Sequence, residues 1–305
     1  MNSGGCVPKA VPYDGTKGTT GNENGMELIK LCWGTLMLRP YVFVFLAAFL
    51  TAGFLKMGKR KTMSFMLITW TVAFICEFSS TRNGFPFGLY HYIGDTRDRE
   101  LFLSNIPFYD SLSFSFLLFA SYSMALFMLA PLKISKKNIE VLDHFQLRQS
   151  KSVLFLTTLF MMMIDVVIDP VALRGDQWFL GRIYYYETPG YHFGVPLSNA
   201  FGWAFVGFVS LLIFQKFEKQ YRSHRKPKPK KSKIPYHTLM GVGLYYGVLG
   251  FMLSICWWID ERALLIANAF MFLLPTISLI VRFRDPRARA TEQDWKKHCE
   301  DFSMT

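Results

Sequence analysis

Long apolar runs alternate with short polar segments along most of this chain. A helix of about 20 residues crosses a hydrocarbon core roughly 30 Å thick, and seven of the runs fit that length. The predicted membrane-spanning helices lie near residues 36–57, 62–80, 110–132, 152–172, 199–216, 237–259 and 263–282. The pattern therefore predicts an all-α, polytopic membrane protein of about seven transmembrane helices.

The flanking segments are polar. Residues 1–30 are Gly-rich and too polar for a cleaved signal peptide, so we expect a retained, disordered N-terminal tail. Residues 36–282 would form a seven-helix membrane domain that carries any catalysis, and residues 283–305 a cytoplasmic C-terminal tail. Composition agrees with this division, because the 305 residues are 51% hydrophobic, 17% aromatic and only 18% charged, unlike those of a soluble domain.

The net charge of +12 is concentrated in alternate loops. Of the 34 Lys and Arg residues, 24 lie in segments 56–62, 133–151 and 216–236 and in the tail after Val281. The positive-inside rule places these segments in the cytoplasm, with the N-terminus outside and the C-terminus inside. The Lys/Pro run at 226–233 is better interpreted as a solvated loop near anionic lipid heads than as a nucleic-acid patch.

The two long loops on the predicted outer side are aromatic and glycine-rich. The first reads EFSSTRNGFPFGLYHYIGD from Glu77, and the second runs from Asp165 to Trp203 through GDQWFL and YHFGVPLSNAFGW. Simple connections would be polar, so we expect both loops to fold over the helix ends as a lid. For Trp178 and residues 184–186, an aromatic belt at the lipid headgroups is an equal alternative.

The spacing of polar residues is similar in the two loops. The matched positions are Glu77 and Asp165 near the preceding helix ends, Pro107 and Pro196 respectively 30 and 31 residues later, and Asp110 and Asn199 three residues after each proline. The spacing indicates a helix–loop–helix unit used twice in the same orientation.

Two carboxylic acids lie in the apolar stretch MMMIDVVIDPVA at residues 161–172. Asp165 and Asp169 are four residues apart and therefore share one face of the predicted helix. Asp165 would lie about 18 Å along that helix at 1.5 Å per residue. Pro170 should end or kink the helix and leave a carbonyl free to face a cavity. Two buried acids one turn apart cannot easily both ionise, so one should hold a proton, as an acid–base pair requires.

Each acid also has an alternative, non-catalytic role. Asp169 could be a helix-end residue in contact with water, Asp165 a buried hydrogen-bonding link to another helix, and Glu77 an interfacial residue. We favour function for Asp165, because ionisable residues within membrane helices are usually functional.

The sequence lacks the residues that several other kinds of membrane enzyme or pigment protein require. The six histidines form no cluster of the kind that binds two irons, and the five cysteines share no metal-ligand spacing. Dinucleotide and P-loop fingerprints are absent, and residues 263–282 hold no lysine for a retinal Schiff base. DVVID lacks the Asn-Asp-x-x-Asp form of membrane prenyltransferases. The remaining expectation is acid–base chemistry on an apolar substrate without a cofactor or metal, such as addition of water to an isoprenoid double bond.

Motifs along residues 62–282 resemble those of a known family. GFPFGLYHYIGD (84–95), IPFYDSLSF (106–114), MMIDVVIDPVA (162–172), GDQWFL (175–180) and YHFGVPLSNAFGW (191–203) together resemble the carotenoid 1,2-hydratases, of the γ-carotene and bisanhydrobacterioruberin hydratase type. The resemblance implies a multi-pass protein of the cell membrane that adds water across the terminal 1,2 double bond of an acyclic or monocyclic carotenoid. It implies no cofactor, and as partners an apolar carotenoid, the lipid bilayer and other carotenoid-pathway enzymes.

We assign roles to site residues from their positions. Asp165 or Asp169 would give the proton, and the other acid or Glu77 would activate water. The expected substrate-binding residues are Phe87, Tyr90, Tyr92, Asp110, Trp178, Asn199 and Trp203, of which the two tyrosines and two tryptophans would line a carbocation site and Asn199 would orient water. The non-enzymatic alternatives are a carotenoid- or lipid-binding membrane protein and a transporter with intramembrane acids.

Overall fold

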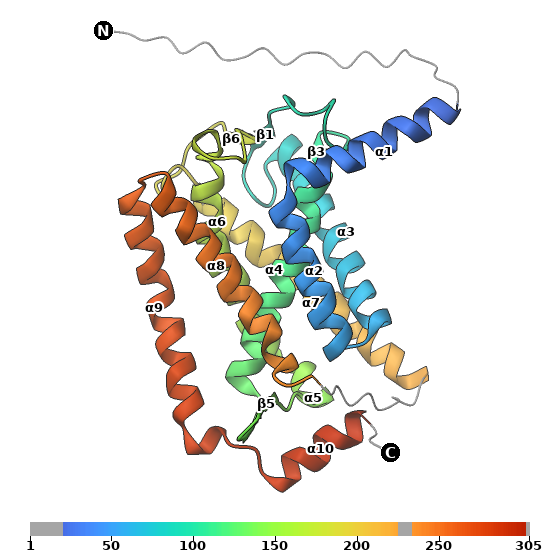
Figure 1. The fold of residues 1–305 in the computed structure, drawn as a ribbon, viewed down its shortest axis with the longest axis vertical. Coiled ribbons are helices and arrows are strands. Elements are labelled where there is room, and N and C mark those ends of the chain that lie inside the picture. The colour runs from blue at the N-terminus through green and yellow to red at the C-terminus, as the bar shows by residue number, and fades with distance from the viewer. Residues whose placement is uncertain (1–20, 225–233, 303–305) are drawn as a thin grey trace.

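A computed structural model of the chain describes residues 21–224 and 234–302, and its long helices run side by side as a bundle (Figure 1). The helices are α1 (Gly21–Leu38), α2 (Pro40–Lys56), α3 (Lys59–Asn83), α4 (Phe108–Leu129), α5 (Phe145–Arg148), α6 (Lys151–Ala172), α7 (Leu197–His224), α8 (Met240–Trp258), α9 (Arg262–Arg284) and α10 (Glu292–Phe302). The strands are β1 (Tyr90–Tyr92), β2 (Phe102–Leu103), β3 (Ile106–Pro107), β4 (Leu132–Ser135), β5 (Asn138–Val141) and β6 (Tyr184–Tyr186). The single-turn 3₁₀ segments are η1 (Gly175–Gln177), η2 (His237–Leu239) and η3 (Pro286–Ala288).

The fold confirms the all-α, polytopic membrane class. Six described helices are long and apolar enough to cross a membrane: α3, α4, α6, α7, a span from η2 through α8, and α9. The pair α1 and α2 passes the same test jointly but is bent by 90°, which allows up to seven spans. The first predicted span at 36–57 is thus represented by α2, which begins at Pro40.

The structure describes the two predicted flanking segments only in part. A disordered tail through residue 30 is wrong for residues 21–30, because α1 begins at Gly21. Residues 1–20 and the Lys/Pro run 226–233 lie outside the described residues. The C-terminal segment after residue 282 contains the last turn of α9, the short η3 and α10.

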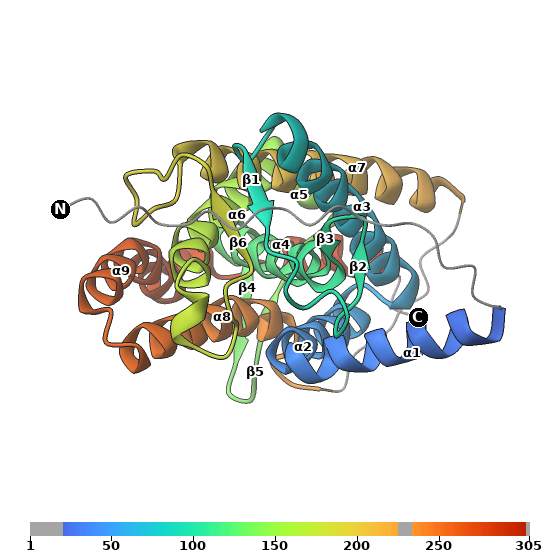
Figure 2. The same cartoon turned by 90° about the horizontal axis from the view of Figure 1, so that it is seen from above.

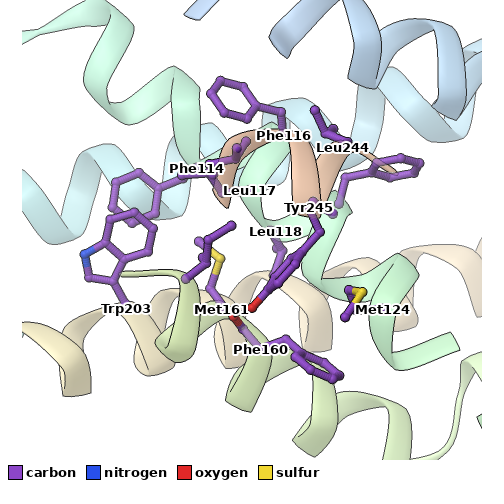
Figure 3. Close-up of a cluster of buried hydrophobic side chains, with 14 of the residues drawn as sticks. Phe114, Phe116, Leu117, Leu118, Met124, Phe160, Met161, Trp203, Leu244 and Tyr245 are labelled. Carbon is purple, nitrogen blue, oxygen red and sulfur yellow. Dashed lines mark hydrogen bonds between the residues drawn. The ribbon is translucent and has the colours of Figure 1, made fainter. Parts of the chain in front are cut away.

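Helix α4 is the centre of the bundle (Figure 2). Of its apolar window, 83% is buried, whereas the corresponding fraction for the peripheral α9 is 22%. Small residues permit this packing: a Cβ at Gly241 of α8 would lie 2.1 Å from Oγ of Ser123 on α4. Figure 3 shows the apolar centre, where the Tyr245 hydroxyl donates to the carbonyl of Phe160 at 3.0 Å. Close approach of helix backbones is the usual source of stability inside a membrane.

The two aromatic loops meet at one end of the bundle. Helix α3 ends at Gly84, whose φ of 80° lies in the left-handed region that glycine adopts at low cost. Strand β1 of the first loop then pairs antiparallel with β6 of the second, with His91 opposite Tyr185 at the centre. The prediction that both aromatic loops fold over the bundle is confirmed.

The opposite end of the bundle holds the β4–β5 hairpin, α5 and α10 (Figure 1). A buried ion network joins its elements. Arg148 of α5 donates to Glu218 of α7 at 3.1 Å, and Lys61 of α3 reaches the same carboxylate at 2.8 Å. Lys56 of α2 lies 3.4 Å from Asp143. Buried charges are tolerated when they are paired in this way, so the network fixes this end of four helices.

The packing of the central helices agrees with the predicted internal repeat. Helix α3 contacts α4 and α7, and α6 correspondingly contacts α7 and α4. Exchanging the pair α3/α4 with the pair α6/α7 therefore preserves the contacts. The antiparallel pairing of β1 with β6 is what a two-fold relation between the two loops produces.

Candidate functional site

The first acidic group joins α3, α4 and the first loop. It consists of Glu77, Asp110, Ser111 and Tyr92, and we call it the Glu77 group. The Ser111 hydroxyl donates to Glu77, while the Tyr92 hydroxyl lies 2.6 Å from Asp110 and 3.2 Å from Glu77. Glu77 is only 2% exposed. The single phenol therefore bridges two carboxyl groups from neighbouring helices.

The second acidic group joins α6, α7 and the second loop. It consists of Asp165, Asp169, Asn199 and Tyr186, and we call it the Asp169 group. The Asn199 amide donates to Asp165 at 2.9 Å and to Asp169 at 2.6 Å. The Tyr186 hydroxyl donates to the same Asp169 oxygen at 3.3 Å. Asp169 is 8% exposed, so it is not the water-exposed helix end considered above. Asp165 is 1% exposed and has the hydrogen bond to a neighbouring helix that was considered as its alternative role.

The two groups occupy matching places in the repeat. Glu77 and its partner Ser111 are 34 residues apart, and Asp165 and its partner Asn199 are also 34 residues apart. A tyrosine from the β1–β6 ribbon completes each group. Ser111 was missed from the sequence, although this equal spacing could have indicated it.

A cavity with a volume of about 80 Å³ lies between the groups. Its lining residues are Glu77, Phe87, Tyr90, Tyr92, Asp110, Ser113, Phe114, Leu117, Ile168, Asp169, Ala172, Ile183, Tyr184, Tyr186, Asn199 and Trp203. None of these lining residues is a lysine or arginine. Carboxyl groups of both repeats therefore face one space without a neighbouring cation in its wall.

Aromatic rings form much of the cavity wall. Tyr90 lies edge-on to Tyr92 and Tyr184, with ring centroids 5.3 and 5.8 Å apart. Phe114 stacks on Trp203 at 4.3 Å. Burial, with the nearby carboxyl groups, raises the pKa of the loop tyrosines well above its usual value, so their hydroxyls keep their protons and act as donors.

Eight of the ten residues expected at the site line this cavity: Glu77, Phe87, Tyr90, Tyr92, Asp110, Asp169, Asn199 and Trp203. Asp165 lies outside the lining and contacts it through Asn199. Trp178 is not brought to the cavity, since its ring packs against Tyr41 and Phe251. Sequence reasoning gave no cavity role to Tyr184 and Tyr186, for which it left belt and lid open.

The end of α6 differs from expectation. The helix does not end at Pro170 but continues to Ala172. Proline has no N–H to bond the carbonyl four residues earlier, and that carbonyl, of Val166, accepts a hydrogen bond from His192 Nε2 at 3.0 Å instead of facing the cavity. The Trp178 indole donates to the carbonyl of Val171 at 3.1 Å. The second loop thus donates hydrogen bonds to backbone carbonyls at the end of α6 and holds Asp169 in position.

The fold and the site together define a polytopic membrane protein with a buried, acidic and aromatic cavity. The profile of a family described as "Carotenoid biosynthesis protein" matches residues 36–275, and the chain belongs to this family. It therefore has a role in carotenoid modification.

One curated relative is similar in sequence. Bisanhydrobacterioruberin hydratase from Haloarcula japonica is 27% identical over 185 residues, which is 59% of this chain. The match spans about half of that relative, 55% of its length. No solved structure matches this chain.

Proposed function

We propose that this protein is a cofactor-independent carotenoid hydratase of the cell membrane. It would add water across the terminal 1,2 (1′,2′) double bond of an acyclic or monocyclic carotenoid and give a tertiary alcohol. Family membership and the name of the relative support the substrate class and the reaction. The observation that carries the proposal is that carboxyl groups of both repeats face one aromatic cavity.

The first step is protonation of the double bond. Asp169 faces the cavity and shares the Asn199 amide with Asp165, so a proton held by this pair is available at Asp169. Transfer of that proton to one alkene carbon uses the π electrons for the new C–H bond. The more substituted carbon becomes a tertiary cation. Asp165 acts through Asn199 as a positioning residue in this scheme.

The second step is capture of the cation by water. The rings of Tyr90, Tyr184 and Trp203 line the cavity and would stabilise positive charge there. The Glu77 group accepts a proton from the attacking water as the C–O bond forms. The net reaction adds one water molecule and consumes no proton once the proton returns to the Asp169 group.

The test is expression of the full chain in a host that makes lycopene or γ-carotene. We expect a new carotenoid heavier by one water molecule, with a tertiary hydroxyl at the ψ end. A matched culture expressing Asp169→Asn at the same membrane level should keep the original pigment. Unchanged pigment with the wild-type chain, together with carotenoid that co-purifies with it, would instead support a non-catalytic binding protein.

A further inference from the structure

Helix α1 meets the bundle at a right angle. Residues 25–38 of α1 are bent by 90° from α2, and α1 projects sideways at the end where the aromatic loops lie (Figures 1 and 2). The sequence explains the corner, because Arg39 precedes Pro40 and proline disfavours helical backbone in the residue before it. The 17 residues of α2 alone extend about 25 Å, close to the hydrocarbon thickness. The residues of α1 are therefore not needed to complete this span.

One face of α1 is fixed to the first loop. Thr35 is 2% exposed, and its hydroxyl oxygen accepts a hydrogen bond from the Leu101 backbone N–H at 2.8 Å. A Cβ at Gly34 would lie 1.8 Å from the carbonyl oxygen of Arg99. At the corner, Arg39 forms a buried pair with Glu100, with both nitrogen to oxygen distances at 3.0 Å. The orientation of α1 relative to the bundle is thus set by protein contacts.

The opposite face of α1 is an apolar stripe that the described residues 21–224 and 234–302 leave exposed. The stripe consists of Met26, Ile29, Trp33 and Met37, which are 67%, 70%, 62% and 55% exposed. Their spacing of three, four and four residues places them on one side of the helix. The exposed Glu27 lies about 100° around the helix from Met26, on a different side, whereas the exposed Lys30, four residues after Met26, borders the stripe. The helix therefore has an apolar stripe bordered by one lysine, whose long side chain suits the headgroup region, and a separate side bound to the loop.

We infer that the α1 stripe binds the lipid interface of the membrane that the bundle spans. The neighbouring α2 also exposes apolar surface, with Val44 65% exposed. A helix perpendicular to a membrane-spanning neighbour lies in the membrane plane, and an amphipathic helix in this position buries its apolar side at the headgroup boundary. Trp33 is a residue type enriched there. This inference is independent of the proposed reaction.

Cysteine scanning of the full chain tests the inference. In a background with Cys6, Cys32 and Cys299 replaced by serine, single cysteines at Ile29 and Trp33 on the stripe would be labelled with the fluorophore NBD. Matched controls are single cysteines at Glu27, on another side of α1, and at the exposed Asp98 of the first loop. Each protein is reconstituted into vesicles of phosphatidylcholine and phosphatidylglycerol. Fluorescence is quenched either by nitroxide-labelled lipid or by aqueous iodide.

We expect lipid nitroxide to quench the stripe positions at least about twofold more than the controls, and iodide to show the opposite order. Strong iodide quenching at all four positions would overturn the inference. Protection of the stripe from both quenchers would also overturn it, because it would indicate a second copy of the chain on that face. Cross-linking of the same single-cysteine proteins would then capture the dimer.

Discussion

Asn199 forms hydrogen bonds with both aspartates of α6, but the two aspartates differ in their position relative to the cavity. Its one amide nitrogen contacts both carboxyl groups, yet only Asp169 lines the cavity. From sequence, Asp165 was the preferred catalytic acid because it lies deeper in the predicted helix. Depth along a helix does not specify which side chain borders a space formed by three other helices and two loops. The structure therefore shifts our preference to Asp169 as the group that contacts substrate.

Amide substitutions at the two aspartates should have unequal effects. Asp169→Asn removes the proposed donor and should lower conversion by about 100-fold or more, the usual range for a general acid. Asp165→Asn keeps a hydrogen-bonding group next to Asn199 and should lower it less, by about tenfold. Product formation per unit of membrane protein measures both. Full activity of Asp169→Asn would contradict its assignment, and full activity of Asp165→Asn would leave Asp165 a purely structural link.

Tyr92 is expected to matter through one hydroxyl. Tyr92→Phe keeps the ring but removes the donor shared by Asp110 and Glu77, so we expect a fall in turnover of about tenfold with little loss of folded protein. The matched control is Tyr185→Phe, on the paired strand but outside the cavity lining. The rate of product formation is measured for both variants at several substrate concentrations. Equal effects of both would argue against a specific role of the Tyr92 hydroxyl.

At the scale of elements, α7 packs against the first loop through a glycine. A Cβ at Gly202 would lie 2.2 Å from the ring of Phe87, which lines the cavity. Gly202→Ala should therefore lower the free energy of unfolding by about 1–3 kcal/mol and reduce activity by displacing this ring. Gly247→Ala in α8 is the control, since nothing lies within 4 Å of its Cβ position. Thermal unfolding in detergent should show loss only for the former.

The Arg39–Glu100 pair gives a second prediction about elements. It ties the corner between α1 and α2 to the first loop, and the Arg39 guanidinium also donates to the carbonyl of Leu180 in the second loop. Arg39→Met leaves Glu100 buried without its partner and should cost about 3–5 kcal/mol of stability. The double variant Arg39→Met with Glu100→Met should recover part of that loss. A double variant less stable than the single one would contradict this account.

How much of the site the sequence could predict depends on the range of the interactions involved. Hydropathy, the aromatic loops and the spacing from Glu77 to Asp110 and from Asp165 to Asn199 are local or repeated patterns, and they identified the helices and half of the sixteen cavity residues. The contact of His192 with Val166 and the Arg39–Glu100 pair join segments 26 and 61 residues apart without a repeated pattern. The position of Trp178 outside the cavity lining could not be predicted for the same reason. Loop geometry decides which side of α6 its ring covers.

On the scale of the whole molecule, the repeat explains why one cavity contains two acidic groups. Each unit of two helices and a loop contributes two carboxyl groups, a polar partner on its second helix and a tyrosine. The two-fold arrangement brings both sets to the same space, while Ser111 in one unit and Asn199 in the other make them chemically unequal. Unequal groups suit a reaction that needs a proton donor at one side of a double bond and a proton acceptor at the other.

The distribution of charge gives the last prediction, the orientation of the bundle in the membrane. The cavity and the aromatic loops lie at one end, and the described Lys- and Arg-rich segments 56–62, 133–151 and 282–297 lie at the other, which the positive-inside rule assigns to the cytoplasm. In a variant without Cys6, Cys32 and Cys299, a membrane-impermeant maleimide should label Asp98→Cys in intact cells. Lys136→Cys, in the β4–β5 turn, should react only after permeabilisation. The reverse order would place the cavity at the cytoplasmic side.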